Sequence, residues 1–252
     1  MTATPAWPPA STPRLFVDTP LVDGGAVVIE GNAAHYLRNV MRVADGAPVR
    51  LFDDISGEWL ATCALSGKRA IIASPTHKLR DREAVPDLWL CFAPVKKAPL
   101  DWLVEKATEL GAARLVPVMT ERTIVDRVNL ERLRAIAIEA AEQCGRTALP
   151  AVAAPVKLTA LLADWPVDRA LLFADESGGD PAARVMAASP APAALLTGPE
   201  GGFTDRERAL LIAHAATRRF SLGPRILRAE TAVLAATAVW MAVADGNGES
   251  AG

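Results

Sequence analysis

The sequence has little of what a metal centre or a disulfide framework requires. Its three cysteines, Cys63, Cys91 and Cys144, are far apart and show no CxxC spacing, so neither disulfides nor a thiolate zinc site is expected. The three histidines lack the helical spacing that would join them as metal ligands. We therefore expect no metal, and a reducing compartment, the cytoplasm, as the location of the protein.

Long hydrophobic runs and an excess of one charge are also missing. The most apolar stretch, residues 231–244, is shorter than the roughly 20 residues that a membrane-spanning helix needs, so no membrane partner is expected. Residues 1–13 contain prolines where a signal peptide needs an unbroken apolar run, and we expect a disordered lead-in. The formal net charge of -2 means that any nucleic-acid binding must come from a local patch.

The composition is that of a folded protein, and the pattern of apolar and polar residues divides the chain into two parts. Hydrophobic residues make up 51% of the 252 residues, enough for a packed core. Residues 14–80 show short apolar segments separated by turn residues, which predicts a small β-barrel, with one helix at 32–43. A polar linker at 78–86 follows. Residues 86–245 then alternate apolar strands with helices, which predicts an α/β domain.

Several helices of this second domain have clear signals. Apolar residues at three- and four-residue intervals predict a helix over 100–110, ended by Gly111. Thr204 and Glu207 have the spacing of a capping box at the start of a helix. The predicted helices after the first cover residues 129–144, 181–188, 205–216 and 230–244.

Two glycine-bearing segments each follow a predicted strand directly: TGPEGGF at 197–203 and SLGPRILRAETA at 221–232. Ligands of parallel sheets bind beyond the carboxyl ends of the strands, where glycine permits close approach of the backbone. Neither GxGxxG nor GxxxxGK[ST] is present, so the ligand need not carry phosphate. S-adenosylmethionine is such a ligand. The alternative is that these glycines only form tight strand-to-helix turns.

The motifs resemble those of a known family. PRLFV, HYLRNVMR with a DG turn, LFD, KATELG, TERT, EAAEQCGR, GPEGGF and LGPRILRAETA span nearly the whole chain. Together they are similar to the bacterial 16S ribosomal-RNA uridine-N3 methyltransferases of the SPOUT superfamily. The loop at residues 53–57 departs from the family pattern, since it is longer than the usual tight turn.

The resemblance implies a PUA-like β-barrel followed by a SPOUT α/β domain with a trefoil knot, acting as a homodimer on 16S rRNA in the 30S ribosomal subunit. It implies S-adenosyl-L-methionine as the cofactor, bound in the knot, with further contacts from residues 173–176. The implied cofactor contacts are Thr197, Gly198, Pro199, Glu200, Gly201, Leu222, Gly223, Ile226, Leu227, Arg228 and Ala232.

The reaction that the resemblance implies is an in-line displacement in which a uridine nitrogen attacks the methyl carbon. Our hypothesis is that Arg228 stabilises negative charge on the base while Glu200 or Glu230 takes the proton. Glu230 and Thr231 begin the last helix, whose amides could help to hold the anion. The alternative for Arg228 and Glu230 is a mutual salt bridge that shapes the loop.

A local basic patch could contact RNA phosphates. Residues 66–82 hold five basic residues against one acidic residue. The alternative for this stretch is a solvated linker. The candidate RNA contacts are Arg14, Arg38, Arg42, Lys68, Arg69, Lys96 and Lys97.

Two other functions stay open on the sequence. One is a SPOUT methyltransferase that acts on transfer RNA, which KATELG and the N-terminal barrel disfavour. The other is a non-catalytic RNA-binding assembly factor that keeps the fold, which the intact GPEGG and RILRAET motifs disfavour.

Overall fold

The computed structural model describes residues 12–67 and 69–248, and it divides the chain into two compact units. The first is the described part of Met1–Ala84 together with Ala141–Ala148. The second is Val85–Ala140 together with the described part of Leu149–Gly252. The predicted linker at 78–86 spans the passage from one unit to the other, whereas the return of residues 141–148 to the first unit was not predicted.

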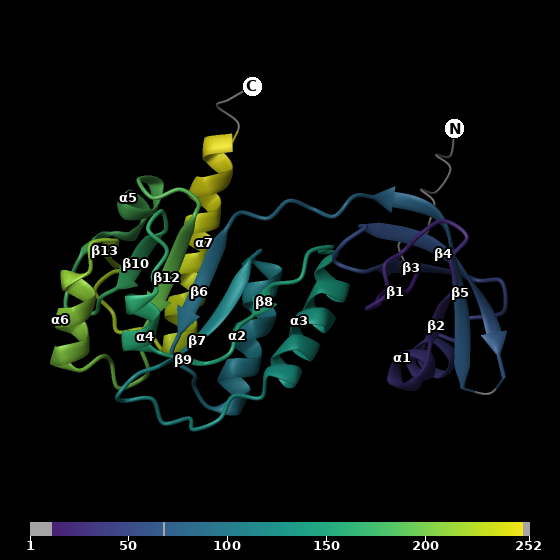
Figure 1. The fold of residues 1–252 in the computed structure, drawn as a ribbon, viewed down its shortest axis with the longest axis horizontal. Coiled ribbons are helices and arrows are strands. Elements are labelled where there is room, and N and C mark those ends of the chain that lie inside the picture. Colours follow the sequence, from purple (N-terminus) through teal and green to yellow (C-terminus); the bar gives the residue numbers. More distant parts are fainter. Residues whose placement is uncertain (1–11, 68, 249–252) are drawn as a thin grey trace. The chain divides into compact units, whose positions relative to one another are not determined.

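The first unit is built on a curled, mixed five-stranded sheet (Figure 1). The strand order is β1-β3-β4-β5-β2, and β1 runs parallel to β3 while the other neighbours are antiparallel. Alternate side chains of these strands enclose one apolar core. The strands are β1 (Arg14–Phe16), β2 (Val27–Ile29), β3 (Pro48–Phe52), β4 (Glu58–Ser66) and β5 (Ala70–Arg80).

A short helical segment packs on this core where a helix was predicted at 32–43. It consists of α1 (Gly31–His35) and a single π-helical stretch, η1 (Tyr36–Val40). Ala34 and Leu37 are its fully buried residues and belong to the core. The predicted helix is thus present but ends earlier.

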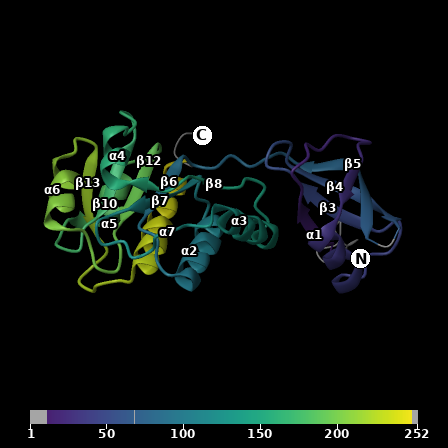
Figure 2. The ribbon, with the colours of Figure 1, turned by 60° about the horizontal axis from the view of Figure 1, so that its bottom comes forward.

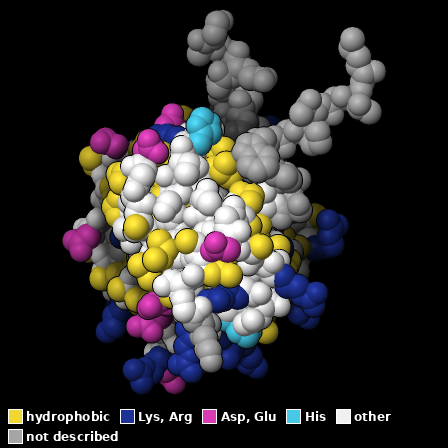
Figure 3. Space-filling model, turned by 90° about the vertical axis from the view of Figure 1, so that its right-hand side faces the viewer, with side chains coloured by type: hydrophobic (Ala, Val, Ile, Leu, Met, Phe, Trp, Pro, Cys, Tyr) yellow, Lys and Arg dark blue, Asp and Glu magenta, His cyan; other side chains and the backbone are white. Residues whose placement is uncertain are grey.

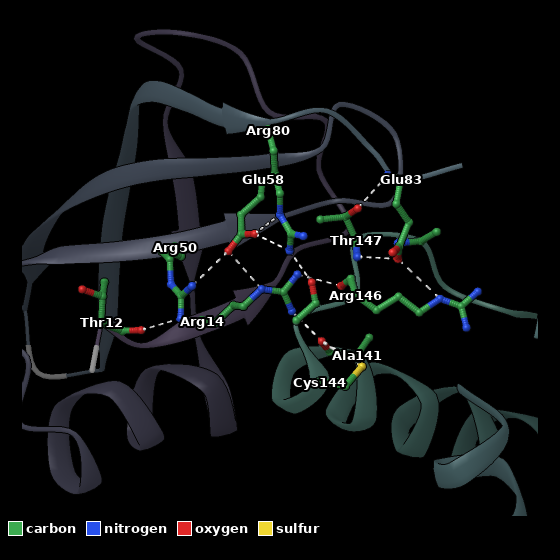
Figure 4. Close-up of polar contacts among 12 residues, drawn as sticks. Thr12, Arg14, Arg50, Glu58, Arg80, Glu83, Ala141, Cys144, Arg146 and Thr147 are labelled. Carbon is green, nitrogen blue, oxygen red and sulfur yellow. Dashed lines mark hydrogen bonds and ion pairs between the residues drawn. The ribbon is translucent and has the colours of Figure 1, made fainter. Parts of the chain in front are cut away.

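One buried carboxylate gathers three arginines in the first unit (Figure 4). The side chain of Glu58 is 3% exposed, and its Oε1 accepts a hydrogen bond of 3.0 Å from Nε of Arg14. Nε of Arg80 donates to Oε2 at 2.6 Å, and Nη1 of Arg50 lies 3.7 Å from Oε1. The guanidinium of Arg14 also stacks on the ring of Phe52, 3.8 Å from its centroid.

The same arginines bind the segment 141–148 (Figure 4). Arg14 donates from Nη1 to the carbonyl of Ala141 at 2.5 Å and from Nη2 to that of Arg146 at 2.6 Å. Arg80 donates to the carbonyl of Gly145. Cations suit this position because carbonyls at the C-terminal end of a helix carry partial negative charge. These bonds explain why the segment belongs to the first unit.

The second unit is an α/β domain around a parallel sheet in the order β11-β13-β10-β12-β6-β7-β8, with β9 also paired to β7. Its core strands are nearly continuous apolar runs, as a sheet covered on both faces requires. The strands are β6 (Leu88–Phe92), β7 (Arg114–Met119), β8 (Ala151–Val152), β9 (Val156–Lys157), β10 (Ala170–Ala174), β11 (Asp180–Pro181), β12 (Ala193–Thr197) and β13 (Thr217–Ser221).

Helices cover both faces of this sheet (Figure 2). One apolar core includes buried residues of α2, α3, α5 and α7, and a second core on the other face includes those of α4 and α6. Among the described residues no helix is long and apolar enough to cross a membrane. The helices are α2 (Lys97–Glu109), α3 (Leu130–Cys144), α4 (Leu158–Ala163), α5 (Ala182–Ala187), α6 (Asp205–Ala213) and α7 (Ala229–Gly248).

The local sequence signals of this unit match the structure closely. Gly111 follows α2 with a φ of +93°, and Thr204 and Glu207 form the predicted capping box of α6. Helix α6 ends at Ala213 rather than at residue 216, because His214 is already extended and the chain turns into β13 at Thr217. Helix α4 was not predicted.

Replacing Glu58 by glutamine tests the arginine cluster. The amide keeps the shape but removes the charge that compensates a buried Arg14, and breaking a buried ion pair costs about 3 to 5 kcal/mol. We expect urea denaturation, followed by circular dichroism, to show a loss of this size. Glu105→Gln, which removes a partly exposed partner of Lys106, should cost less than about 1 kcal/mol. Equal small losses would contradict the role given to Glu58.

Candidate active site

Three loops meet at the carboxyl edge of the sheet in the second unit. They follow β10, β12 and β13, which are neighbours in the order β13-β10-β12 and run in the same direction. Residues of these loops line a cavity of about 470 Å³. Small-molecule sites typically measure about 300 to 1,000 Å³, so the cavity is large enough for a nucleoside-sized ligand.

Most of the residues expected to bind the cofactor line this cavity. Gly201 and Arg228 are not among the lining residues, although Gly202 and Leu227 beside them are. Of the expected catalytic residues, Glu200 lines the cavity, whereas Glu230 and Thr231 lie next to lining residues. The expected residues on the wall are Thr197, Gly198, Pro199, Glu200, Leu222, Gly223, Ile226, Leu227 and Ala232.

Two glycines of the GPEGG loop are required by its geometry. Gly202 has a φ of +66°, in the left-handed region that side chains disfavour. A Cβ on Gly198 would lie 2.8 Å from Cε2 of Phe203, whose ring packs edge-on against Phe173 at a centroid distance of 5.4 Å. The absence of a side chain at Gly198 therefore lets the loop pack against the ring of Phe203.

Among the described residues, two of the buried polar atoms without a hydrogen-bond partner belong to residues expected in the site. One is Oγ1 of Thr197, on the cavity wall, and the other is Oε2 of Glu230 at the start of α7. Such atoms are costly unless something satisfies them. Arg228 is exposed and forms no ion pair with Glu230, so the salt bridge considered as an alternative is absent.

An ion-pair network at the cavity was missed in the sequence. Asp175 follows β10 directly, and its carboxylate accepts hydrogen bonds from Arg208 on α6 and Arg219 on β13. Burial acts to raise the pKa of Asp175, but bonds from Arg208, the Ser177 amide and Arg219 outweigh it and hold the pKa below its ordinary value. The position of an aspartate at the end of a buried strand was a usable signal, whereas nothing local marked its partners.

The GPEGG loop is also tied to the loop after β7, where the TERT motif lies. Nη1 of Arg122 donates to the carbonyl of Gly201 at 2.7 Å. The amide of Glu121 donates to Oε1 of Glu207 at 2.8 Å, so the capping box of α6 has an additional partner. These bonds give TERT a structural role beside the cavity.

The candidate RNA contacts differ in availability. Arg14 is buried and bound to Glu58 and to carbonyls, so the expectation that it contacts RNA is not supported: its guanidinium is used within the first unit. Arg38 donates to the carbonyls of Gly67 and Ala70, which brings it beside the turn that carries Arg69.

The other candidates are exposed or not described. Arg42 and Arg69 are exposed in the first unit, and Lys96 and Lys97 are exposed at the start of α2 in the second. In the view of Figure 3, basic side chains lie mainly around the lower rim and the right-hand edge. Lys68 lies outside the described residues.

The basic stretch at 66–82 is largely compensated by acidic groups. Lys78 pairs with Asp81, Arg80 with Glu58 and Arg82 with Asp54. Much of the positive charge counted in the sequence is therefore used in the unit itself.

Comparison with known proteins agrees with the two units. Residues 82–241 match the RNA methyltransferase domain family, and residues 29–75 match the RNA methyltransferase PUA domain family. The ribosomal RNA small subunit methyltransferase E of Synechocystis sp. is 34% identical over 232 residues, covering 89% of this chain and 76% of the relative. That of Rickettsia conorii is 29% identical over 229 residues, covering 89% and 93%.

A solved structure is also similar. The ribosomal RNA small subunit methyltransferase E from Neisseria gonorrhoeae, bound to S-adenosyl methionine, superposes with a TM-score of 0.84 at 29% identity, covering 92% of this chain and 98% of that one. The fold is thus that of an RNA methyltransferase domain preceded by a PUA domain. The chain belongs to the family of ribosomal RNA small subunit methyltransferase E.

The lowered pKa of Asp175 predicts a pH dependence of stability. Because the unfolded aspartate has a pKa of about 3.9, the stability that the ionised group contributes is present above that pH and is lost as the pH falls toward the lower folded pKa. We expect the difference in unfolding free energy between the wild type and Asp175→Asn to shrink from pH 5 to pH 3, measured by urea denaturation. A constant or growing difference would contradict this assignment.

Proposed function

We propose that the protein transfers the methyl group of S-adenosylmethionine to N3 of a uridine in 16S ribosomal RNA, in the cytoplasm and on the assembled 30S subunit. The observation that carries the proposal is the cavity at the carboxyl ends of β13, β10 and β12, lined by the GPEGG and LGPRIL loops. The relatives named for methylation of small-subunit ribosomal RNA, one of them bound to S-adenosyl methionine, support it.

The residues of the cavity fit such a cofactor. Its wall combines the apolar side chains of Leu222, Ile226 and Leu227 with glycine loops whose backbone can approach an adenine closely. The unpartnered hydroxyl of Thr197 offers a hydrogen bond, and the carboxylate of Glu200 suits a nearby positive charge. No phosphate-binding loop is needed for this ligand.

The chemistry can be assigned to groups of this chain. S-adenosylmethionine, when bound, supplies a methyl group that is activated toward a nucleophile. Arg228 is exposed next to the lining residue Leu227, where its guanidinium can stabilise negative charge on the base. Thr231 is exposed in the first turn of α7, where amides and the helix dipole favour the same charge.

The two candidate proton acceptors, Glu200 and Glu230, differ in how deeply they are buried. Glu200 is exposed on the cavity wall, whereas Glu230 is 7% exposed and is not among the lining residues. A general base must reach the proton that it takes, directly or through one water. We therefore assign the role of proton acceptor to Glu200. Glu230 has a supporting role at the start of α7.

The RNA would be held by basic groups outside the cavity. The candidates that remain available are Arg38, Arg42 and Arg69 in the PUA unit and Lys96 and Lys97 in the catalytic unit. We further expect the trefoil knot and the homodimer that the resemblance implies. Ile226, which is 88% exposed beside the cavity, is an apolar group that a second copy could cover.

Deletion of the gene tests the reaction. We expect small-subunit RNA from the deletion strain to lack one 3-methyluridine in a nuclease digest analysed by mass spectrometry. The purified protein with S-adenosylmethionine should restore it on 30S subunits. A loss in transfer RNA, or a protein that shows no heat of binding with S-adenosylmethionine, would instead support one of the two alternative functions.

Arg228→Ala separates catalysis from cofactor binding. Because the side chain lies beside the wall and not on it, we expect the affinity for S-adenosylmethionine to change by no more than a few-fold. Methyl transfer should fall by about 100-fold or more, the usual effect of removing a group that stabilises transition-state charge. Calorimetry and single-turnover methylation measure the two effects, and turnover near the wild-type rate would show that the role is wrong.

A further inference from the structure

The carboxylate of Asp175 joins the three chain segments that form the cavity. Its side chain is 1% exposed, and it stands at the end of β10. Oδ1 accepts a hydrogen bond of 3.0 Å from the amide of Ser177 in its own loop. The other partners are Arg208 on α6, which follows the GPEGG loop, and Arg219 on β13, which leads into the LGPRIL loop.

The geometry uses both oxygens of the carboxylate. Arg208 binds in a bidentate way, with Nε 3.1 Å from Oδ1 and Nη2 2.9 Å from Oδ2. Nε of Arg219 donates to Oδ2 at 2.8 Å, and its Nη2 donates to the carbonyl of Gly178 at 2.9 Å. Bidentate charge-assisted bonds fix orientation as well as distance. Ser177, Gly178 and Arg208 are themselves lining residues, so the network is part of the wall.

We propose that Asp175 is a positioning residue that fixes the three cavity loops relative to one another and thereby sets the affinity for the methyl donor. The inference rests on the proposed function, which places S-adenosylmethionine in this cavity. Without the carboxylate, the guanidinium groups of Arg208 and Arg219 would lose the acceptor that they share, and the segments that carry them would separate. The binding step would then have to order the loops, which lowers affinity.

The role of Asp175 predicts a separation between binding and chemistry. A group that only positions the binding loops should change the affinity for the donor, while turnover of the saturated enzyme changes little. A purely structural role would lower the stability of the protein and would not change donor affinity in preference to turnover. A tenfold loss of affinity corresponds to about 1.4 kcal/mol, an amount that the cost of ordering the loops on binding accounts for.

Asp87 offers a matched control in the same unit. It also pairs with an arginine, since Oδ2 accepts a 2.6 Å hydrogen bond from Nη2 of Arg169. It precedes β6, however, and neither it nor Arg169 lines the cavity. Asp87 is more exposed than Asp175, at 51% against 1%, and Asp87→Asn removes a carboxylate charge from an arginine pair without touching the cavity wall.

The experiment compares full-length wild type, Asp175→Asn and Asp87→Asn. Calorimetry with S-adenosylmethionine and S-adenosylhomocysteine should show an affinity at least about tenfold weaker for Asp175→Asn and within about twofold of wild type for Asp87→Asn. Methylation of 30S subunits at saturating donor should stay within about threefold for both variants. Circular dichroism checks the fold of each.

The outcomes distinguish the inference from the function on which it rests. Wild-type affinity in Asp175→Asn, or equal weakening in both variants, would overturn the inference alone. Should Asp175→Asn fail to fold, Arg219→Gln is measured in its place, because it removes only the partner on β13. An affinity for S-adenosylmethionine at least about threefold weaker than that of the wild type would support the inference. An unchanged affinity would overturn it. Failure of the wild type to bind either compound would overturn the proposed function, and the inference with it.

Discussion

Parallel pairing of three neighbouring strands is the constraint from which the site follows. Leu172 of β10 pairs with Leu195 of β12 on one side and with Arg218 of β13 on the other. Parallel hydrogen bonding obliges all three strands to end at the same edge. The loops after them therefore meet, although residues 175 and 222 are far apart in the sequence. Helices on both faces leave that edge as the place where a ligand can enter.

Each unit depends on one buried carboxylate that serves more than one arginine. Glu58 is bonded to Arg14 and Arg80, which in turn bind carbonyls of the segment 141–148. Asp175 does the same for the walls of the cavity. In both places a single negative charge stabilises contacts between distant parts of the chain, which is why the arginine content says little about RNA binding.

The predictable part of the fold is the part that local chemistry decides. The alternation of strands and helices, the end of α2 at Gly111 and the capping box of Thr204 follow from residues within a few positions of one another. Helix α4, which has six residues and no side-chain cap at its start, was not predicted. The end of α6 was predicted three residues too late, because the chain is already extended at His214 and enters β13 at Thr217.

The candidate site also has a part that could be predicted from the sequence and a part that could not. GPEGGF and LGPRILRAETA could be found in the sequence because each is a contiguous run of residues directly after a strand, and most of their residues do line the cavity. Arg122 and Arg208 could not be found, since their partners lie 79 and 33 residues away in the chain.

The sequence by itself determined the type of each major element, the two glycine loops and the family to which the chain belongs. Only the tertiary structure decided that Arg14 is buried against Glu58, that residues 141–148 belong to the first unit, and that Asp175 holds three segments together. The reason is physical. Propensity and capping act between neighbours in the chain, whereas burial and ion pairing depend on which distant residues the packed sheets and helices bring into contact.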